Sequence, residues 1–390
     1  MATLNGSGKQ AGNHKLLGLD HLRTLAITLV FFYHYRIFQH PEWIEHAGSF
    51  GWTGVDLFFV LSGYLIAGQL FNRVAQGKGL AMGEFYFKRA FRILPPYLVI
   101  VALYFCLPVF REREALPPLW KFLTFTQNFG LDLLHRGTFS HAWSLCIEEQ
   151  FYLLLPVIML ISLRLRAGKR ASWLLLFLFA LGFVIRFGSW YGRVIPFEDT
   201  DQFWVEWYKW IYYPFQSRLD GLLVGVGLAG LYQFYPAVKD RLAGKGNLLL
   251  GIGLGLVAIA YVFCADQQSF HASVFGFPLV ALAYGTLVAA AVSPSCILYT
   301  FHAKISAQIA TLSYAIYLSH KGVIHLTQRL FIHWGIAGDS NLMFCICIVT
   351  TILGALVLRY SVEKPFLRLR DRILQQRRAQ QERLPVKMRA

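Results

Sequence analysis

Two ionisable residues, Arg23 and His34, stand in one almost wholly apolar stretch of the chain, with ten residues between them. Because eleven helical positions make about three turns, both side chains would share one face, about 16 Å apart along the axis. Ionisable groups in a membrane span usually face a bundle interior or a wet cavity, so this pair indicates a functional site. The alternative is a snorkelling arginine and a histidine that only hydrogen-bonds to a neighbouring helix.

Two adjacent carboxylates, Glu148 and Glu149, lie at the start of another apolar stretch, shortly after Trp143 and Ser144. A carboxylate there suits the positive end of a helix dipole. It also has the chemistry to orient an imidazole and raise its basicity, as a general base needs. Two interpretations stay open: a catalytic partner of His34, or a helix cap in which Ser144 takes part.

Arg89 and Arg92 are spaced i, i+3 at the start of a further apolar stretch, so a helix would place both on one face. With Arg23 they would form a cationic rim for a phosphorylated cytosolic ligand, because guanidinium groups bind phosphate with two hydrogen bonds. The alternative is an ordinary anchor of positive charge at the membrane surface.

Other polar residues also lie in or near apolar stretches. Each has a structural interpretation, as an ion pair or an interhelical hydrogen bond worth about 1 kcal/mol in lipid. Together they make the interior more polar than the packing of a bundle requires. They are Asp56, Trp143, Ser144, Arg218, Asp220, Tyr317 and His320.

The composition indicates a polytopic membrane protein. Of 390 residues, 56% are hydrophobic and only 15% are charged, whereas about a quarter are charged in a soluble domain. The net charge of +16 comes from lysines and arginines in alternate loops and in the tail, so anionic lipid, not nucleic acid, is the expected partner. No P-loop, GxSxG or HExxH sequence and no metal-ligand spacing of cysteines and histidines is present, so no metal is expected.

The apolar stretches predict an all-α bundle of about ten spans. The cation-rich loops follow the second, fourth and sixth spans, which places both termini in the cytoplasm. Arg23 then lies near the inner face and His34, Glu148 and Glu149 near the outer face. The long outer loops, 111–146 and 191–214, are expected to lie on the membrane or to close over a site. The predicted spans are 18–38, 52–72, 91–110, 147–164, 172–190, 215–234, 247–265, 272–292, 308–330 and 341–361.

These motifs, in this order, resemble those of the acyltransferase 3 family of integral membrane O-acyltransferases. Arg23-x10-His34 and Arg89-x-x-Arg92 match two family signatures, and the block from Trp143-Ser144-Leu145 to Glu148-Glu149-Gln150-Phe151-Tyr152 matches a third. Weaker matches are Gly54–Phe59, Arg218-Leu219-Asp220 and the segment from Ser313 to His320. The resemblance covers about residues 18–367, between a polar cytoplasmic N-terminus (1–17) and a basic cytoplasmic tail (368–390).

The resemblance implies ten transmembrane helices in a bacterial plasma membrane and acyl-CoA, usually acetyl-CoA, as the donor. The acceptor would be a hydroxyl group of a cell-surface glycan or of a lipid-linked or metabolite sugar. Some members carry an extracellular SGNH domain, for which this chain has no room, so the standalone branch is expected. No particular oligomeric state is implied.

In the expected mechanism, Arg23, Arg89 and Arg92 hold the CoA phosphates, and His34 acts as a general base or as a transient acyl carrier. Glu149, with Glu148 as second candidate, orients His34. The rival class is a transporter or exporter of a glycan or small anionic solute, in which the buried ionisable groups form a proton or substrate pathway. A membrane scaffold would leave those groups without a purpose.

Overall fold

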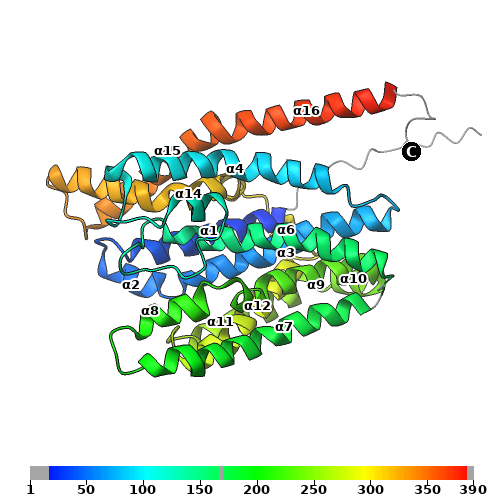
Figure 1. Cartoon of the computed structure of the whole chain (residues 1–390), viewed down its shortest axis with the longest axis horizontal. Coiled ribbons are helices and arrows are strands. Elements are labelled where there is room, and N and C mark those ends of the chain that lie inside the picture. The colour runs from blue at the N-terminus through cyan, green and yellow to red at the C-terminus, as the bar shows by residue number, and fades with distance from the viewer. Residues whose placement is uncertain (1–16, 167, 169, 384–390) are drawn as a thin grey trace, which may run out of the picture.

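The computed structural model describes residues 17–166, 168 and 170–383, and these residues form helices and no strands. Figure 1 shows the long helices lying side by side along the longest axis of the molecule. The expected all-α bundle is therefore confirmed. The ten long helices of the bundle are α1 (Leu17–Tyr35), α3 (Gly54–Ala75), α4 (Met82–Cys106), α6 (Trp143–Arg164), α7 (Arg170–Ser189), α9 (Asp220–Phe234), α11 (Gly246–Phe263), α12 (Phe277–Ala291), α14 (Lys304–His333) and α15 (Asn341–Leu358).

Within the described residues, seven helices are long and apolar enough to cross a membrane, or eight if a bent pair counts as one span. The bent pair is α9 and α10 (Pro236–Ala243), which meet at 102°. The seven do not include α1 and α14, which carry ionisable residues such as Arg23 and Lys321 in their interiors. The protein is thus membrane-embedded, while the count of ten spans and the cytoplasmic termini stay predictions.

The helix that carries Arg89 and Arg92 begins at residue 82, nine residues before the predicted span. The polar first turns contain Glu84, whose carboxylate pairs with the Lys88 ammonium at 2.6 Å in an i, i+4 arrangement that favours the helix. As a result both arginines lie inside α4. The sixth predicted span, 215–234, is shorter than expected because residues after Pro214 form a separate turn and α9 begins at Asp220.

Helix α1 packs against α3 and α14, and α3 packs against α9 along most of its length. Small residues permit this close approach: a Cβ atom on Gly225 of α9 would lie 2.3 Å from the Val60 carbonyl oxygen of α3. In Figure 1, α16 (Lys364–Arg383, red) lies at the edge of the bundle beside α4. Arg378 of α16 pairs there with Glu84 at 3.2 Å.

The long connections carry short helices. These are α2 (Glu42–Gly48), α5 (Leu119–Leu123), α8 (Phe203–Trp207) and α13 (Ile297–Thr300), with several 3-10 and π-helical turns between them. Of the predicted polar N-terminus, only Leu17 is among the described residues, and the tail beyond residue 383 also lies outside them.

Candidate active site

Two cavities lie in the bundle, and the first is lined by arginines from two helices. This arginine cavity, of about 240 Å³, contains Arg23 of α1 with Arg89 and Arg92 of α4. The sequence predicted that these three residues would share one site, and the structure brings them together. The cavity is also lined by polar residues of α3, α6 and α14, namely Ser62, Gln69, Ser144, Glu148, Glu149, Tyr152, Ser313, Tyr314 and Tyr317.

The cations of the arginine cavity differ in their partners. Arg23 forms an ion pair with Asp20, one turn earlier on α1, at 3.1 Å. The guanidinium carbon of Arg89 lies 4.8 Å from the ring centroid of Tyr152, and Arg92 is exposed. Among the described residues, neither Arg89 nor Arg92 has a carboxylate within ion-pair distance, so both retain donors for an anionic ligand.

The two glutamates line the arginine cavity and do not contact His34. The Glu148 carboxylate accepts hydrogen bonds from the Ser62 hydroxyl at 3.1 Å and from the Tyr152 hydroxyl at 2.9 Å. Because α6 begins at Trp143, Glu148 and Glu149 lie about 8 Å further along its axis than its first residue. The expected pairing of Glu149 or Glu148 with His34 is therefore not what the structure shows.

The second cavity, of about 470 Å³, is lined by histidines and aromatic rings. This histidine cavity contains His34 and His141, and its cations are Arg36, Arg113 and Lys321. The long loops predicted to close over a site do so here, since they supply much of the lining. The aromatic lining consists of Tyr33, Trp52, Trp143, Trp204, Tyr208, Tyr212 and Tyr213.

Three imidazoles form a buried cluster at this cavity: His34, His141 and His320, which are 8%, 2% and 0% exposed. Their ring centroids are 4.9 Å (His34 to His320), 5.5 Å (His34 to His141) and 4.8 Å (His141 to His320) apart. His320 Nε2 and His34 Nδ1 share a hydrogen bond of 2.9 Å. The hydrogen-bonding partner of His34 is thus another histidine, from α14.

The two cavities approach each other closely. Val55 of α3 lines both. Beside it, Ser144 Oγ and the Tyr317 hydroxyl are 2.6 Å apart, and Tyr317 also donates a hydrogen bond of 2.6 Å to the backbone carbonyl of His141. Tyr317 and Ser144 line the arginine cavity, whereas His141 lines the histidine cavity. Val55 and Tyr317 therefore belong to the wall between the two cavities.

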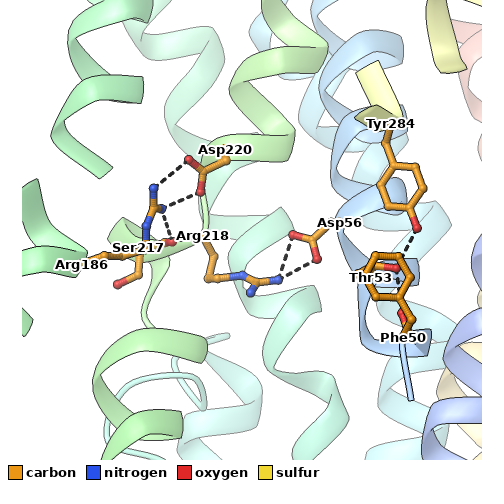
Figure 2. A network of polar contacts seen from close by, with 8 residues as sticks. All are labelled: Phe50, Thr53, Asp56, Arg186, Ser217, Arg218, Asp220 and Tyr284. Atoms are coloured by element: carbon orange, nitrogen blue, oxygen red, sulfur yellow. Dashed lines mark hydrogen bonds and ion pairs between the residues drawn. The ribbon is translucent and has the colours of Figure 1, made fainter. Parts of the chain in front are cut away.

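Two buried ion pairs, Arg218 with Asp56 and Arg186 with Asp220, lie within the bundle (Figure 2). Arg218 donates two hydrogen bonds to the Asp56 carboxylate, at 2.9 and 3.0 Å. Arg186 donates to the Asp220 carboxylate at 2.6 and 3.2 Å and to the Ser217 carbonyl at 2.8 Å. Asp56, Arg218 and Asp220 thus form buried ion pairs, one of the arrangements that the sequence analysis considered.

Arg218 also contacts the aromatic wall of the histidine cavity. Its guanidinium carbon lies 3.9 Å from the ring centroid of Phe277, 4.6 Å from that of Tyr212 and 5.4 Å from that of Trp143. Trp143 and Tyr212 line the histidine cavity, so the ion pair and the cation–π contacts hold two rings of its wall in place.

Sequence reasoning missed three residues at the site. His141 was not given a role, although it precedes the recognised Trp143 block by two positions. Lys321, buried in α14, pairs with Glu112 of a loop at 2.8 Å. A lysine next to His320 in an apolar helix is itself a signal of function, whereas its loop partner has no sequence signal. No group of three His, Cys, Asp or Glu residues in the described part of the chain is arranged to hold a metal ion.

Comparison with known proteins identifies the family. The model of the acyltransferase domain family matches residues 16–360, and the chain belongs to this family. It is 28% identical over 332 residues to the peptidoglycan O-acetyltransferase OatA of Listeria monocytogenes, covering 79% of this chain and 49% of that protein. It is also 28% identical over 371 residues to the O-acetyltransferase OatA of Staphylococcus aureus, covering 89% of this chain and 56% of that protein.

The chain thus spans about half the length of the curated relatives it matches. No solved structure matches the chain. The family match favours the acyltransferase interpretation over the rival class of transporters.

Proposed function

We propose that the protein is a plasma-membrane O-acyltransferase that moves an acyl group, most simply acetyl, from acyl-CoA to a hydroxyl of a cell-surface or membrane-linked carbohydrate. One observation carries this proposal: a cationic cavity and an aromatic, histidine-lined cavity share Val55 as a common wall. The family supplies the reaction class, and both relatives named above are O-acetyltransferases.

The arginine cavity fits the donor by its charge. CoA carries phosphate groups, and the guanidinium groups of Arg89 and Arg92 have no ion-pair partner among the described residues, with Arg23 in the same cavity. In this proposal the cavity opens to the cytoplasm, as the distribution of charged loops predicts. The acyl-bearing arm of CoA then points toward Ser144, Tyr317 and Val55.

The histidine cavity fits the acceptor by its lining. Aromatic rings pack against the C–H faces of sugar rings, while the polar edges of Tyr and Trp satisfy sugar hydroxyls. Seven aromatic residues line this cavity. A cavity of about 470 Å³ is in the range of small-ligand sites, so it accommodates the end of a glycan and not a long segment.

His34 lies where the acceptor hydroxyl would enter, and it is the proposed catalytic residue. As a general base it takes the hydroxyl proton while the oxygen bonds to the carbonyl carbon and the carbon–sulfur bond breaks. As an acyl carrier its nitrogen first displaces the thiolate and then passes the acyl group to the hydroxyl. In both routes the hydroxyl proton ends on the CoA sulfur, and Glu149, with Glu148 second, is the proposed relay because both line the donor cavity.

The experiment uses membranes with matched amounts of wild type, His34→Ala or His333→Ala, incubated with radiolabelled acetyl-CoA and a native glycan and lipid extract. His333 is an exposed histidine at the end of α14 and serves as the control. We expect label in the glycan or lipid fraction with wild type and His333→Ala, and a 10²- to 10⁴-fold lower rate, as an order of magnitude, with His34→Ala. Equal labelling by all three proteins would reject His34 as catalytic.

A further inference from the structure

We infer that His320 is a positioning residue that fixes the tautomer of His34. In this tautomer His34 carries its proton on Nδ1, and the lone pair on Nε2 is available to the reacting group. The assignment follows from hydrogen bonds around the histidine cluster (His34, His141 and His320). The catalytic role of the tautomer rests on the proposed function, whereas the assignment of the tautomer does not depend on it.

The contacts of His320 determine which of its nitrogens carries a proton. Its Nδ1 atom lies 3.1 Å from the backbone carbonyl oxygen of Ile316 and 2.9 Å from that of Tyr317. A carbonyl oxygen only accepts hydrogen bonds, so Nδ1 must carry a proton. In a neutral imidazole the other nitrogen, Nε2, then has a lone pair and only accepts.

The charges around the histidine cluster determine whether its imidazoles are protonated. The nearest cation, Lys321, is already paired with Glu112 at 2.8 Å, and both side chains are 1% exposed. At the rim, Arg36 pairs with Glu45, and the Arg113 guanidinium donates to the Leu133 carbonyl. A protonated imidazole in the cluster would add a second buried cation without a carboxylate of its own, which is costly. The imidazoles of the cluster are therefore neutral.

The hydrogen bond between His320 and His34 determines the tautomer of His34. His320 Nε2 lies 2.9 Å from His34 Nδ1, and one of these two atoms must donate. Because His320 Nε2 is the acceptor, His34 Nδ1 carries the proton. This bond uses Nδ1 of His34 and leaves its second nitrogen, Nε2, outside the pair. In this tautomer the lone pair of His34 is on Nε2, and His34 lines the histidine cavity.

Both proposed routes need this lone pair. A general base takes the acceptor proton with it, and an acyl carrier attacks the thioester carbonyl with it. The opposite tautomer would present an N–H group, which does neither. Where the orienting partner of a catalytic histidine favours the wrong tautomer, the rate falls about 10⁴-fold in a serine protease. His320 is the neutral counterpart of such an orienting residue.

The test reads the tautomer directly. Protein labelled with nitrogen-15 in its histidines is purified in detergent, and the ring signals of His34 are assigned by their loss in His34→Ala. We expect a pyrrole-type Nδ1 that carries a proton and a pyridine-type Nε2. A pyridine-type Nδ1, or protons on both nitrogens, at neutral pH would overturn the inference.

Variants of His320 separate positioning from packing. His320→Leu removes the acceptor, and we expect mixed His34 tautomers with a rate of acetyl-CoA thiol release about 100-fold lower. His320→Gln retains an acceptor oxygen, and we expect the wild-type His34 signals with a rate within about tenfold of wild type. The matched control is Gln328→Leu, because Gln328 is also buried in α14 and bonds to Tyr35 of α1 at 3.2 Å.

An unchanged His34 signal in His320→Leu would overturn the inference. If wild type shows the expected tautomer, and His320→Leu scrambles it, yet wild-type protein and His34→Ala release thiol equally slowly, the positioning stands and the proposed function fails. The two ideas therefore fail separately.

Discussion

The hydroxyl groups of Ser144 and Tyr317 are 2.6 Å apart, and this bond lies between the arginine cavity and the histidine cluster. Tyr317 donates its one hydroxyl proton to the His141 carbonyl at 2.6 Å, so Ser144 is the donor in the bond that they share, and His141 lines the other cavity. One tyrosine therefore connects the arginine cavity with the histidine cavity, which are the proposed donor and acceptor sites. In a resting enzyme this contact would keep water of the acceptor cavity away from the thioester.

Tyr317→Phe should raise the rate at which acetyl-CoA is hydrolysed without acceptor by about fivefold. A buried hydrogen bond contributes about 1 kcal/mol. Its loss changes the population of the arrangement in which Tyr317 contacts Ser144 and His141 by about fivefold. The measurement is thiol release in the absence of glycan, with Ser144→Ala expected to act in the same direction. Ser319→Ala is the control, because its hydroxyl donates a hydrogen bond within α14, to the Ala315 carbonyl at 2.8 Å. Unchanged hydrolysis in Tyr317→Phe would contradict this role.

Arg89→Ala and Arg92→Ala should each raise the KM for acetyl-CoA by about ten- to 100-fold, because each removes a charge-assisted hydrogen bond to phosphate. Lys88→Ala should leave the KM unchanged, since Lys88 pairs with Glu84 at 2.6 Å. Kinetics with acetyl-CoA and with its 3′-dephospho form refine the test. The arginine that binds the 3′-phosphate is the one whose removal abolishes the preference between them. If wild type has the same KM for both forms, the 3′-phosphate does not bind at this site.

Arg218→Met should lower the free energy of unfolding by about 3–5 kcal/mol, because it leaves Asp56 buried without its partner. The double variant Asp56→Leu with Arg218→Met should recover part of this loss, since both charges are then gone. Thermal unfolding in detergent measures both effects. Lys209→Met, which breaks the more exposed pair with Glu206, is the control and should cost about 1 kcal/mol or less. A double variant less stable than Arg218→Met would contradict this assignment.

The Glu112–Lys321 pair should make stability depend on pH in the acid range. Burial acts to raise the pKa of the Glu112 carboxyl, but the Lys321 ammonium and hydrogen bonds such as that from the Phe139 amide hold this pKa below its ordinary value of 4.5. A depressed pKa in the folded state stabilises the fold above the ordinary value, and this contribution is lost as pH falls through the folded value.

The melting temperature of wild type should accordingly fall more steeply below about pH 4.5 than that of Glu112→Gln, which has no such carboxylate to protonate. At neutral pH the variant should be the less stable protein, because its Lys321 is buried without a counter-charge. Glu114→Gln, in the same loop but exposed, should retain the wild-type slope. Parallel slopes for wild type and Glu112→Gln would contradict the assignment.

Apolar length and the i, i+3 spacing predicted much of the bundle, and they also predicted that Arg23, Arg89 and Arg92 meet. Both signals are local to a helix, and charged ends that lie at one face of the membrane converge once the helices pack. The start of α4 was placed nine residues late because Glu84 and Lys88 make its first turns polar. Hydropathy does not detect such turns.

The partner of His34 could not be predicted in this way. Glu149 and His34 were both expected near the outer face, but the depth of α6 relative to α1 is set by packing and not by hydropathy. The start of α6 at Trp143 puts the glutamates in the arginine cavity. His320 reaches His34 because α14 packs against α1. Which helices become neighbours depends on contacts across the whole bundle, which no single segment encodes.

In the proposed function, an acyl group passes from the arginine cavity to the histidine cavity by way of His34. The most direct measurement uses sealed, inverted membrane vesicles, with radiolabelled acetyl-CoA added outside and the glycan acceptor enclosed within. We expect label on the enclosed glycan with wild type and loss of that label with His34→Ala at equal protein level. Equal labelling by both proteins, or labelling only when donor and acceptor are on the same side, would contradict it.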